Sequence, residues 1–508
     1  MQDHHRPSPF SIAGLAQDGA PAPAPTSERP ASGFSGAGLA DLAGTVLAAH
    51  LVMLQEQGVI DGHGFDALAR SLDAAQAALA GGPPAPARPT LDALVARIDA
   101  QTPPELAGAA TLGLAREEWL ATMVRLAWRE ALDAVLAAVV DLRAALVDLG
   151  ETHVPTIMPA FAGNRAAQPT NLGHLLGGAI VPLRTATGRL ERARVAIDRS
   201  PLGAGMLAGE ILALDRERQA AVLGFASPVG NTLDAVMSVE DVVEATEAIA
   251  ASVAPVRRFL RELGSWMRSD PDSFLLADAW QVTVEASNPL MTIPEPVELL
   301  VQRLAAVEDR CRTLVGRLRD AAYGPVGSLA DAMLAAASAL GDETPAALGD
   351  ARALLTEGMA INRAYLGNRA GRAYTTGGDL AAFLMAEEGI PPSAARAIAA
   401  MVLRQVQEQK LEVSGIQQDM IDSAAMLTIG REIKVEMETL GRYLAPRRYL
   451  ERRAVLGSPA SASTREWLAS ERADLDADRA SIGAVRGRAE AAIASLTAAI
   501  AAAAEAED

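Results

Sequence analysis

A regular hydrophobic seam between residues 300 and 318 places the strongest constraint on how this chain can fold. Its apolar positions alternate steps of four and three, at Leu300, Leu304, Val307, Cys311, Leu314 and Leu318. A period of 3.5 residues is typical of a helix that packs along other helices. The apolar pattern predicts further long helices over residues 116–149, 173–199 and 239–267. The sequence therefore predicts an all-α protein with a central bundle of long helices, shared between subunits.

The composition agrees with this fold class and limits the kinds of partner that are expected. Half of the 508 residues are hydrophobic but only 4% are aromatic, and alanine and leucine dominate, which favours packed helices. The net charge of -18 argues against a nucleic-acid partner. Cys311 is the single cysteine, so a reducing compartment is expected. Because no apolar run of signal-peptide or membrane-spanning type is found, we expect a cytoplasmic protein without a membrane partner.

The pattern along the chain predicts five parts. They are a disordered Pro/Ala-rich tail (1–36), an N-terminal helical domain (37–113), the long-helix bundle (114–370), a small helical domain (371–469) and an Ala/Glu-rich helical tail (470–508). A linker is expected from Gly81, and a long functional or mobile loop over residues 269–296. Within the small domain, helices are expected over 380–387, 394–407 and 419–440. The last tail has few large apolar side chains, so it is expected to fray.

Residues 200–209 form a turn-like segment that carries a family resemblance. The segment reads Ser-Pro-Leu-Gly-Ala-Gly-Met-Leu-Ala-Gly, and its small residues let backbones pass close together. It is similar to the SPLGAGALAG segment of argininosuccinate lyases, in the aspartase/fumarase superfamily. Other similar blocks follow in the same order, among them residues 156–159, 168–175, 231–236 and 375–384. The resemblance covers roughly residues 39 to 459.

The resemblance implies a three-part, all-α protomer that assembles as a homotetramer, with active sites built from three subunits. The chemistry of the family is β-elimination, in which a base takes a proton next to a carboxylate and a C–N bond breaks to release fumarate. Such a site needs a base, donors that hold the developing anion, and an acid for the leaving nitrogen.

The segment that carries the family's acid/base histidine is altered in this chain. The family's PGYTHLQRAQP aligns with residues 159–169, so that threonine is replaced by Ala162 and histidine by Gly163. The remaining histidines of the folded part match structural positions or follow a helix stop. Asn164 and Arg165 become candidates for binding an anionic substrate, although an exposed loop arginine is the alternative interpretation of Arg165.

The family's signature loop, GSSxMPxKxN, supplies a serine base and a lysine. The corresponding stretch here is residues 283–296, in which Ser287 stands near the serine position, within one or two residues. No lysine is present, and Thr292 or Ile293 occupies its place. The resemblance makes Ser287 the candidate base, with Glu285 as a second choice. The alternative for Ser287 is an ordinary loop serine.

Two further segments supply substrate-binding candidates. The family's TGRSRND aligns with residues 112–118, where Arg116 stands at one arginine; alternatively, Arg116 and Glu117 only begin a helix. Tyr323 is what remains of a later YNRDLQED segment. No phosphate-binding glycine loop, CxxC pair or metal-ligand spacing occurs, so no cofactor and no metal are expected.

These replacements leave two main hypotheses for the function. The first is a diverged lyase that acts on a small, anionic, non-standard substrate. The second is a non-catalytic pseudoenzyme, or a partner subunit that forms a hetero-oligomer with an active lyase paralogue. A helical scaffold without a small-molecule role is a third reading.

Overall fold

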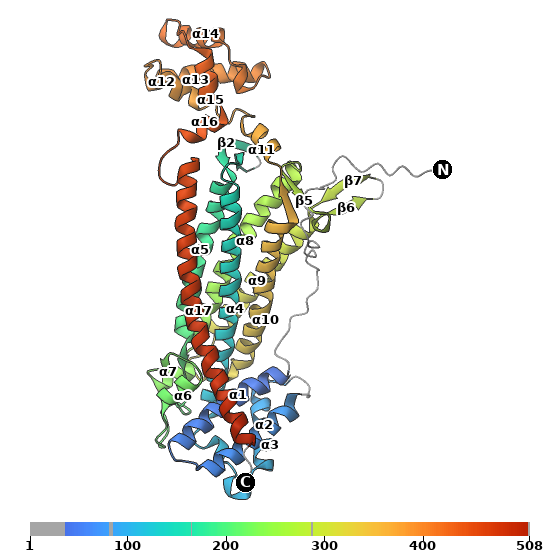
Figure 1. Cartoon of the computed structure of the whole chain (residues 1–508), viewed down its shortest axis with the longest axis vertical. Helices are drawn as coiled ribbons and strands as arrows, with labels where there is room; N and C mark the ends of the chain where they lie inside the picture. The colour runs from blue at the N-terminus through green and yellow to red at the C-terminus, as the bar shows by residue number, and fades with distance from the viewer. Residues whose placement is uncertain (1–35, 81–84, 164, 286–287, 506–508) are drawn as a thin grey trace, which may run out of the picture.

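Five long helices run along one another and form the body of the molecule (Figure 1). The computed structural model describes residues 36–80, 85–163, 165–285 and 288–505, without the side chains of 36–37 and 283–292. The expected N-terminal tail and most of the expected linker lie outside the described residues. The bundle helices are α4 (Arg116–Thr152), α5 (Leu172–Ile197), α8 (Glu240–Ser269), α9 (Glu295–Arg319) and α10 (Ala330–Ala353). The predicted all-α class is confirmed.

The seam from which the bundle was predicted lies on the buried side of α9. All six of its apolar positions are at most 4% exposed, and α9 packs on α8 and α10. Burial raises the pKa of the Cys311 thiol to about 12, so it stays protonated. Helix α10 was not predicted, because its alanine-rich sequence carries little periodicity and contains Pro345. Packing against other helices determines which side of α10 is buried, since α10 packs extensively on α4.

Three helices pack at one end of the bundle: α1 (Gly36–Glu56), α2 (Gly62–Ala80) and α3 (Ala87–Gln101), followed by short 3-10 turns at Pro104–Leu106 and Ala109–Thr111. Length and composition alone would allow α1 to cross a membrane over Gly38–Glu56, where hydropathy is high. However, 67% of that window is buried, and α1 contacts α2, α3 and α4. Its apolar surface is therefore used as protein core, as in other core helices of folded domains.

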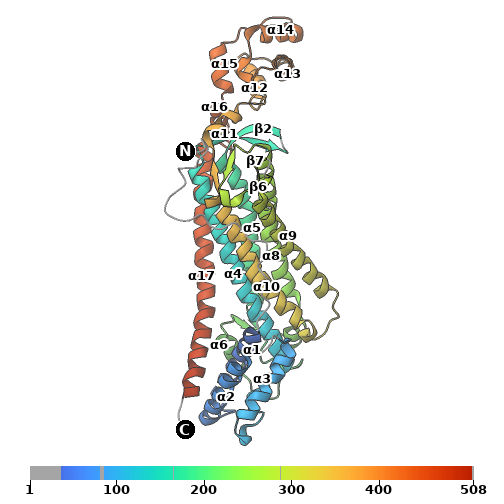
Figure 2. The same cartoon turned by 90° about the vertical axis from the view of Figure 1, so that its right-hand side faces the viewer.

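Short segments between the long helices lie at both ends of the bundle (Figures 1 and 2). At the α1–α3 end are α6 (Arg216–Val222), α7 (Thr232–Met237) and the parallel pair β3 (Arg199–Ser200) and β4 (Ser227–Pro228). At the far end are three antiparallel pairs, β1–β2 (Ile157–Ala162, Arg165–Asn171), β5–β8 (Phe274–Leu276, Met359–Ile361) and β6–β7 (Val282–Glu285, Asn288–Ile293).

The stretch of residues 269–296, expected as one long loop, contains short strands in the structure. Two of the three antiparallel pairs draw strands from this stretch, and a 3-10 turn at Asp278–Trp280 joins them. The strand β5 has only three residues, which is too short to give an alternating pattern in the sequence. Pairing with β8, more than eighty residues later in the chain, fixes β5 in the structure.

A small helical unit follows the bundle and has a core of its own. Its helices are α12 (Asp379–Ala386), α13 (Pro392–Glu408), α14 (Gln418–Ile429), α15 (Met437–Leu444) and α16 (Pro446–Glu451), whereas the preceding α11 (Arg363–Ala370) packs on β1 and β2. The separate core uses buried residues between Leu380 and Leu444. One helix was predicted over 419–440, and this is wrong. Gly430 ends α14 with a left-handed φ of 72°, a conformation that favours glycine.

The last helix, α17 (Ser461–Glu505), returns along the whole bundle and reaches α2 at the other end (Figure 1). The expectation that this tail frays is wrong. Leu468, Leu475 and Leu496 are each at most 4% exposed and pack into the bundle core. A helix that is marginal alone is stabilised here by tertiary packing, which is the usual source of helix stability in proteins.

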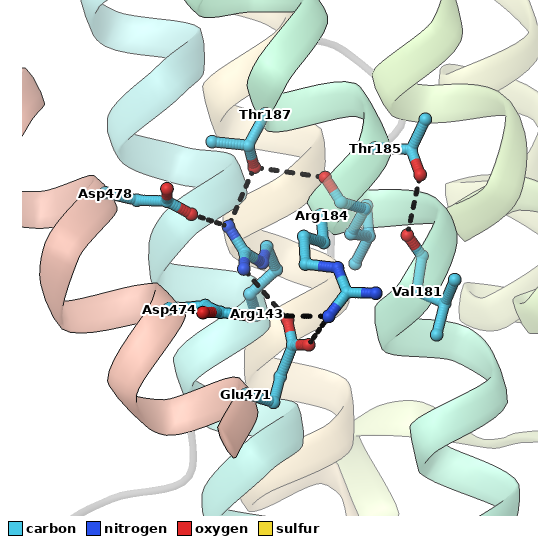
Figure 3. A network of polar contacts seen from close by, with 9 residues as sticks. Arg143, Val181, Arg184, Thr185, Thr187, Glu471, Asp474 and Asp478 are labelled. Carbon is cyan, nitrogen blue, oxygen red and sulfur yellow. Dashed lines mark hydrogen bonds and ion pairs between the residues drawn. The ribbon is translucent and has the colours of Figure 1, made fainter. Parts of the chain in front are cut away.

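A buried polar network also ties α17 to the bundle (Figure 3). Arg143 of α4 is fully buried and donates to Glu471 at 2.9 Å, to Asp478 at 2.5 Å and to the Thr187 hydroxyl at 3.1 Å. The second oxygen of Glu471, also fully buried, accepts from Arg184 of α5 at 2.8 Å. One charged contact therefore joins α17 to α4 and α5, which lie more than 280 residues earlier in the chain.

Candidate active site

The glycine-rich segment of residues 200–209 is a rigid loop beside the first turn of α4. Gly203, Gly205 and Gly209 have φ values of 78°, 64° and 82°. A Cβ added to Gly205 would lie 2.8 Å from the carbonyl oxygen of Gly209, which is too close for any side chain. Ser200, in β3, is fully buried. This part of the loop requires glycine for both its backbone conformation and its close packing.

The carboxylate of Glu118 holds this loop in place. Its Oε2 accepts from the N–H of Gly205 at 2.9 Å, and its Oε1 accepts from the N–H of Ala115 at 2.8 Å. The N–H groups of Gly203 and Ala204 also favour its charged form. Burial outweighs these donors and raises the pKa of Glu118 to about 7. The sequence analysis did not single out Glu118, although an acidic residue three positions after a helix start is a known capping signal.

Arg116 and Tyr323 lie at this end of the bundle. Arg116 is about half exposed and forms an ion pair with Asp92 of α3. The neighbouring Glu117 accepts from Arg88 at 2.6 Å and from the N–H of Gly327 at 3.2 Å. That contact draws the loop of Tyr323 to the start of α4, and Tyr323 itself is 76% exposed. Neither candidate is buried within one chain.

The hairpin that replaces the family's histidine segment lies at the opposite end. Gly163 is at its tip, with φ +59° and open space around the position of a Cβ. Arg165 begins β2 and is exposed. Asn164 lies outside the described residues. Among the described residues, the tip of the β1–β2 hairpin therefore carries one cationic side chain, that of Arg165, and no histidine.

The candidate bases fall in the β6–β7 hairpin. The backbone of Glu285 pairs with Asn288, while Ser287 and the side chain of Glu285 lie outside what the structure describes. The hairpin belongs to the same end of the bundle as β1–β2 (Figure 2). Helix α4 has 37 residues, so its two ends are roughly 55 Å apart at 1.5 Å per residue. One chain thus keeps Arg116 far from the Arg165 and Glu285 segments.

Three histidines of the described chain make structural contacts. His50 lies between the Leu112 carbonyl at 2.9 Å and the Gln219 amide at 3.0 Å, and burial lowers its pKa to about 4. His153 contacts the Thr156 hydroxyl at 3.0 Å, and burial likewise lowers its pKa to about 4. His174 bonds to Thr170 and to the Gly457 carbonyl. Both ring nitrogens of His50 and of His174 are engaged in these contacts, whereas His153 makes its contact through Nδ1 alone.

Within the described ranges, no group of three His, Cys, Asp or Glu side chains is arranged to hold a metal ion. Among the described residues, the ends of the bundle carry guanidinium groups, such as those of Arg116 and Arg165, and backbone N–H donors. Donors of this kind stabilise anions that develop during a reaction.

Comparisons with known proteins agree on one family. A family model described as a lyase matches residues 87–278. Argininosuccinate lyase from Methanoculleus marisnigri is 26% identical over 371 residues, covering 72% of this chain and 73% of the relative. The enzymes of the same name from Alkalilimnicola ehrlichii and Maricaulis maris are 29% and 28% identical, covering 71% and 83% of this chain and 74% and 87% of theirs.

Solved structures show the same fold. EDDS lyase in complex with formate superposes with a TM-score of 0.81 at 22% identity, over 93% of both chains. A variant of EDDS lyase with bound fumarate gives 0.80 over the same share. The 3-carboxy-cis,cis-muconate lactonizing enzyme from Pseudomonas putida gives 0.69 at 18% identity, over 87% of this chain and 96% of that one. In sequence the chain is therefore similar to argininosuccinate lyases over most of its length, and it has the all-α fold of the lyases with solved structures.

Proposed function

We propose that this protein is a lyase that breaks a C–N or other C–heteroatom bond by β-elimination, on a non-standard substrate, with a fumarate-type product. The observation that supports it most is the likeness over 93% of the chain to EDDS lyase, a variant of which holds fumarate. The replacement of the family's histidine by Gly163 argues against argininosuccinate as the substrate.

In the proposed reaction Ser287, or else Glu285, removes the proton next to a substrate carboxylate. The electron pair left on carbon forms the new double bond as the bond to the heteroatom breaks. Arg116, Asn164, Arg165 and Tyr323 bind the anionic substrate, and the arginines replace the missing lysine as sources of positive charge. A leaving group that departs without protonation would need no histidine acid.

Assembly is part of the proposal. The candidate residues of one chain lie at opposite ends of α4, so one chain cannot bring them to one substrate. A homotetramer with antiparallel bundles would place the α4 start of one subunit beside the hairpins of others. Its sites would then each draw on three chains. We further propose that the assembly is cytoplasmic and belongs to specialised metabolism.

The proposal is tested by incubating the purified protein with argininosuccinate and with a panel of N-substituted aspartates, while following the absorbance of the unsaturated product. We expect no turnover of argininosuccinate and turnover of at least one other member. Ser287→Ala or Glu285→Gln should then reduce kcat by about 100-fold or more, as expected for loss of a general base. The exposed residues Ser393 and Glu408 supply matched controls, Ser393→Ala and Glu408→Gln, which should leave kcat unchanged. If both hairpin variants keep full activity, the assignment of the base is wrong.

A second candidate is a non-catalytic subunit that completes the site of an active paralogue. It is favoured by selective loss: the loop of residues 200–209 is intact, while Gly163 and the lysine-free stretch 283–296 stand where the family has catalytic groups. Co-expression with an intact paralogue, followed by native mass spectrometry, separates the two. A stable mixed tetramer would favour this candidate, whereas a pure homotetramer with turnover of its own would exclude it.

A further inference from the structure

A cavity of about 790 Å³ lies between α1, α4 and the second half of α17. This volume is within the usual range of small-molecule sites. Its walls include Leu42 and Thr45 of α1, Leu126 of α4 and Ile493 of α17. The three helices contact one another in this part of the molecule, where α17 runs beside α1 and α4 (Figures 1 and 2). The candidate catalytic segments do not contribute to the walls.

The cavity contains one buried guanidinium without an acidic partner. Arg129 lines it and is only 6% exposed. Its Nη1 donates to the Leu223 carbonyl at 2.9 Å, and its guanidinium carbon lies 4.7 Å from the centre of the Phe225 ring. Within the described part of the chain, no carboxylate forms an ion pair with Arg129. A buried cation that lacks a counter-charge favours an anionic ligand.

The surrounding charges do not supply that counter-charge. Asp133, also in the wall, is bonded to Arg194 at 2.7 Å. Asp198 lies behind it and is paired with Arg194 at 3.2 Å and with Arg488 at 2.6 Å. Three guanidiniums thus face two carboxylates in this cluster, and Arg129 carries the excess positive charge. Burial, followed by the charge of Arg194, lowers the pKa of Arg129 to about 10.

The remaining charged residues of the wall place negative charge near the solvent-exposed edge of the cavity. Arg486 and Glu490 neutralise each other across one turn of α17, at 2.6 Å. Asp41 and Glu130 are exposed, and neither forms an ion pair within the residues that the structure describes. The cavity therefore offers one unpaired cation inside and two unpaired carboxylates near its edge.

We propose that this cavity binds a basic amino acid, with the ligand carboxylate on Arg129 and its two cationic groups near Asp41 and Glu130. A ligand with one negative and two positive charges matches the three unpaired groups one for one. The apolar wall residues Leu42, Leu126 and Ile493 would contact the methylene chain of the ligand. The site is separate from the lyase chemistry: Arg129 lies thirteen residues into α4, roughly 20 Å from Arg116 along the helix.

Calorimetric titration of the full-length protein with L-lysine, in the absence of any lyase substrate, tests the proposal. We expect one site per chain. Cadaverine lacks the carboxylate and L-norleucine lacks the side-chain ammonium, so each should bind at least tenfold more weakly than L-lysine. Equal binding of L-lysine and cadaverine, or no binding of L-lysine, would overturn the proposal.

Variants at the cavity edge make the test independent of folding defects. The double variant Asp41→Asn/Glu130→Gln should weaken L-lysine about tenfold or more and L-norleucine less, because L-norleucine has one of the two cationic groups. Arg129→Gln should weaken L-lysine and L-norleucine but not cadaverine. Glu387→Gln, in the small helical unit, is the matched control and should bind L-lysine like the wild type. An edge variant that binds L-lysine as tightly as the wild type refutes the assignment, whatever the lyase assays give.

Discussion

At the scale of single residues, Glu118 shows how a buried charge can shape a loop. It replaces bulk water as the acceptor for the N–H of Gly205 in this buried turn, and the N–H groups of Gly203 and Ala204 also favour its charge. The loop gains a fixed conformation, and Glu118 loses much of its solvation. The resulting pKa of about 7 lies well above the 4.5 of an ordinary glutamate.

This shift predicts a pH-dependent stability. Because the folded state holds the proton of Glu118 more tightly than the unfolded state, its contribution is fully present below pH 4.5 and is lost as the pH rises through about 7. Glu118→Gln cannot ionise, so relative to wild type it should gain on the order of 3 kcal/mol between pH 4.5 and 8. Urea unfolding of both proteins across this range measures the difference. Glu105→Gln, at an exposed position, should show no such trend, and a constant offset for Glu118→Gln would contradict the prediction.

Gly205 of the same loop, compared with Gly58 after α1, allows a second prediction. Gly58 and Gly205 both have φ between 60° and 75°, but only Gly205 has backbone atoms within reach of an added Cβ. Gly58→Ala should therefore cost about 1 kcal/mol, from the left-handed backbone alone. Gly205→Ala should cost about 1–3 kcal/mol more than Gly58→Ala, because the added methyl group overlaps the Gly209 carbonyl. Equal losses of unfolding free energy in the two variants would mean that the loop relaxes freely.

At the scale of elements, α17 is the part of the chain whose structure depends most on its surroundings. Arg143, Arg184 and Glu471 come from three helices, and each oxygen of Glu471 accepts from one of the two guanidiniums (Figure 3). Buried pairs of this kind add little net stability compared with apolar residues, but breaking one is costly because a charge remains unpaired. The network therefore selects one docking register for α17 among many that its alanine-rich surface would tolerate.

We expect Glu471→Ala to release α17. Two guanidiniums, of Arg143 and Arg184, would lose a partner, and the cost should be about 3–5 kcal/mol. Trypsin should then cut within α17, and its amides should exchange faster in hydrogen-exchange measurements. The neighbouring Arg472 forms only exposed pairs with Asp148 and Glu151, so Arg472→Gln should cost below about 1 kcal/mol and leave α17 protected. Equal protease sensitivity in both variants would contradict a special role of the network.

At the scale of the whole molecule, the long bundle separates the candidate groups. The start of α4 carries Arg116 and the loop of residues 200–209, while the hairpins with Arg165 and Glu285 lie at its other end. A distance of roughly 55 Å is far beyond the reach of any substrate of metabolite size. Under the proposed function, each site of an active assembly therefore draws on more than one chain.

Shared sites predict complementation between inactive variants. Arg116→Ala and Ser287→Ala should each abolish turnover of whichever substrate the panel identifies, when the protein is made alone. When the two variants are co-expressed, some sites in mixed tetramers take Arg116 from one chain and Ser287 from another and are intact. About a quarter of the wild-type activity should return if chains mix randomly and each site needs one residue from each of two chains. The absence of any recovery in confirmed mixed tetramers would place both residues on one chain per site.

The helical class and the bundle could be predicted from the sequence alone, because the information is local. The period of α9 and the apolar spacing of α4, α5 and α8 each specify a helix and its buried side within a few turns. The replacement of the family's histidine by Gly163 could also be inferred from the sequence alone, because it follows from the alignment of residues 159–169. Helix α10 escaped prediction because its alanines are small enough to be buried on any side.

Only the tertiary structure decided the contacts between distant parts of the chain. The carboxylate partners of Arg143 lie more than 300 residues away, and Gly205 meets Glu118 across 87 residues. The cavity walls come from α1, α4 and α17. Side chains such as Glu471 or Arg129 look like ordinary polar surface in a helical pattern, and burial alone gives them their role. Which helix covers which face is set by packing over the whole core, and no local stretch of sequence contains that information.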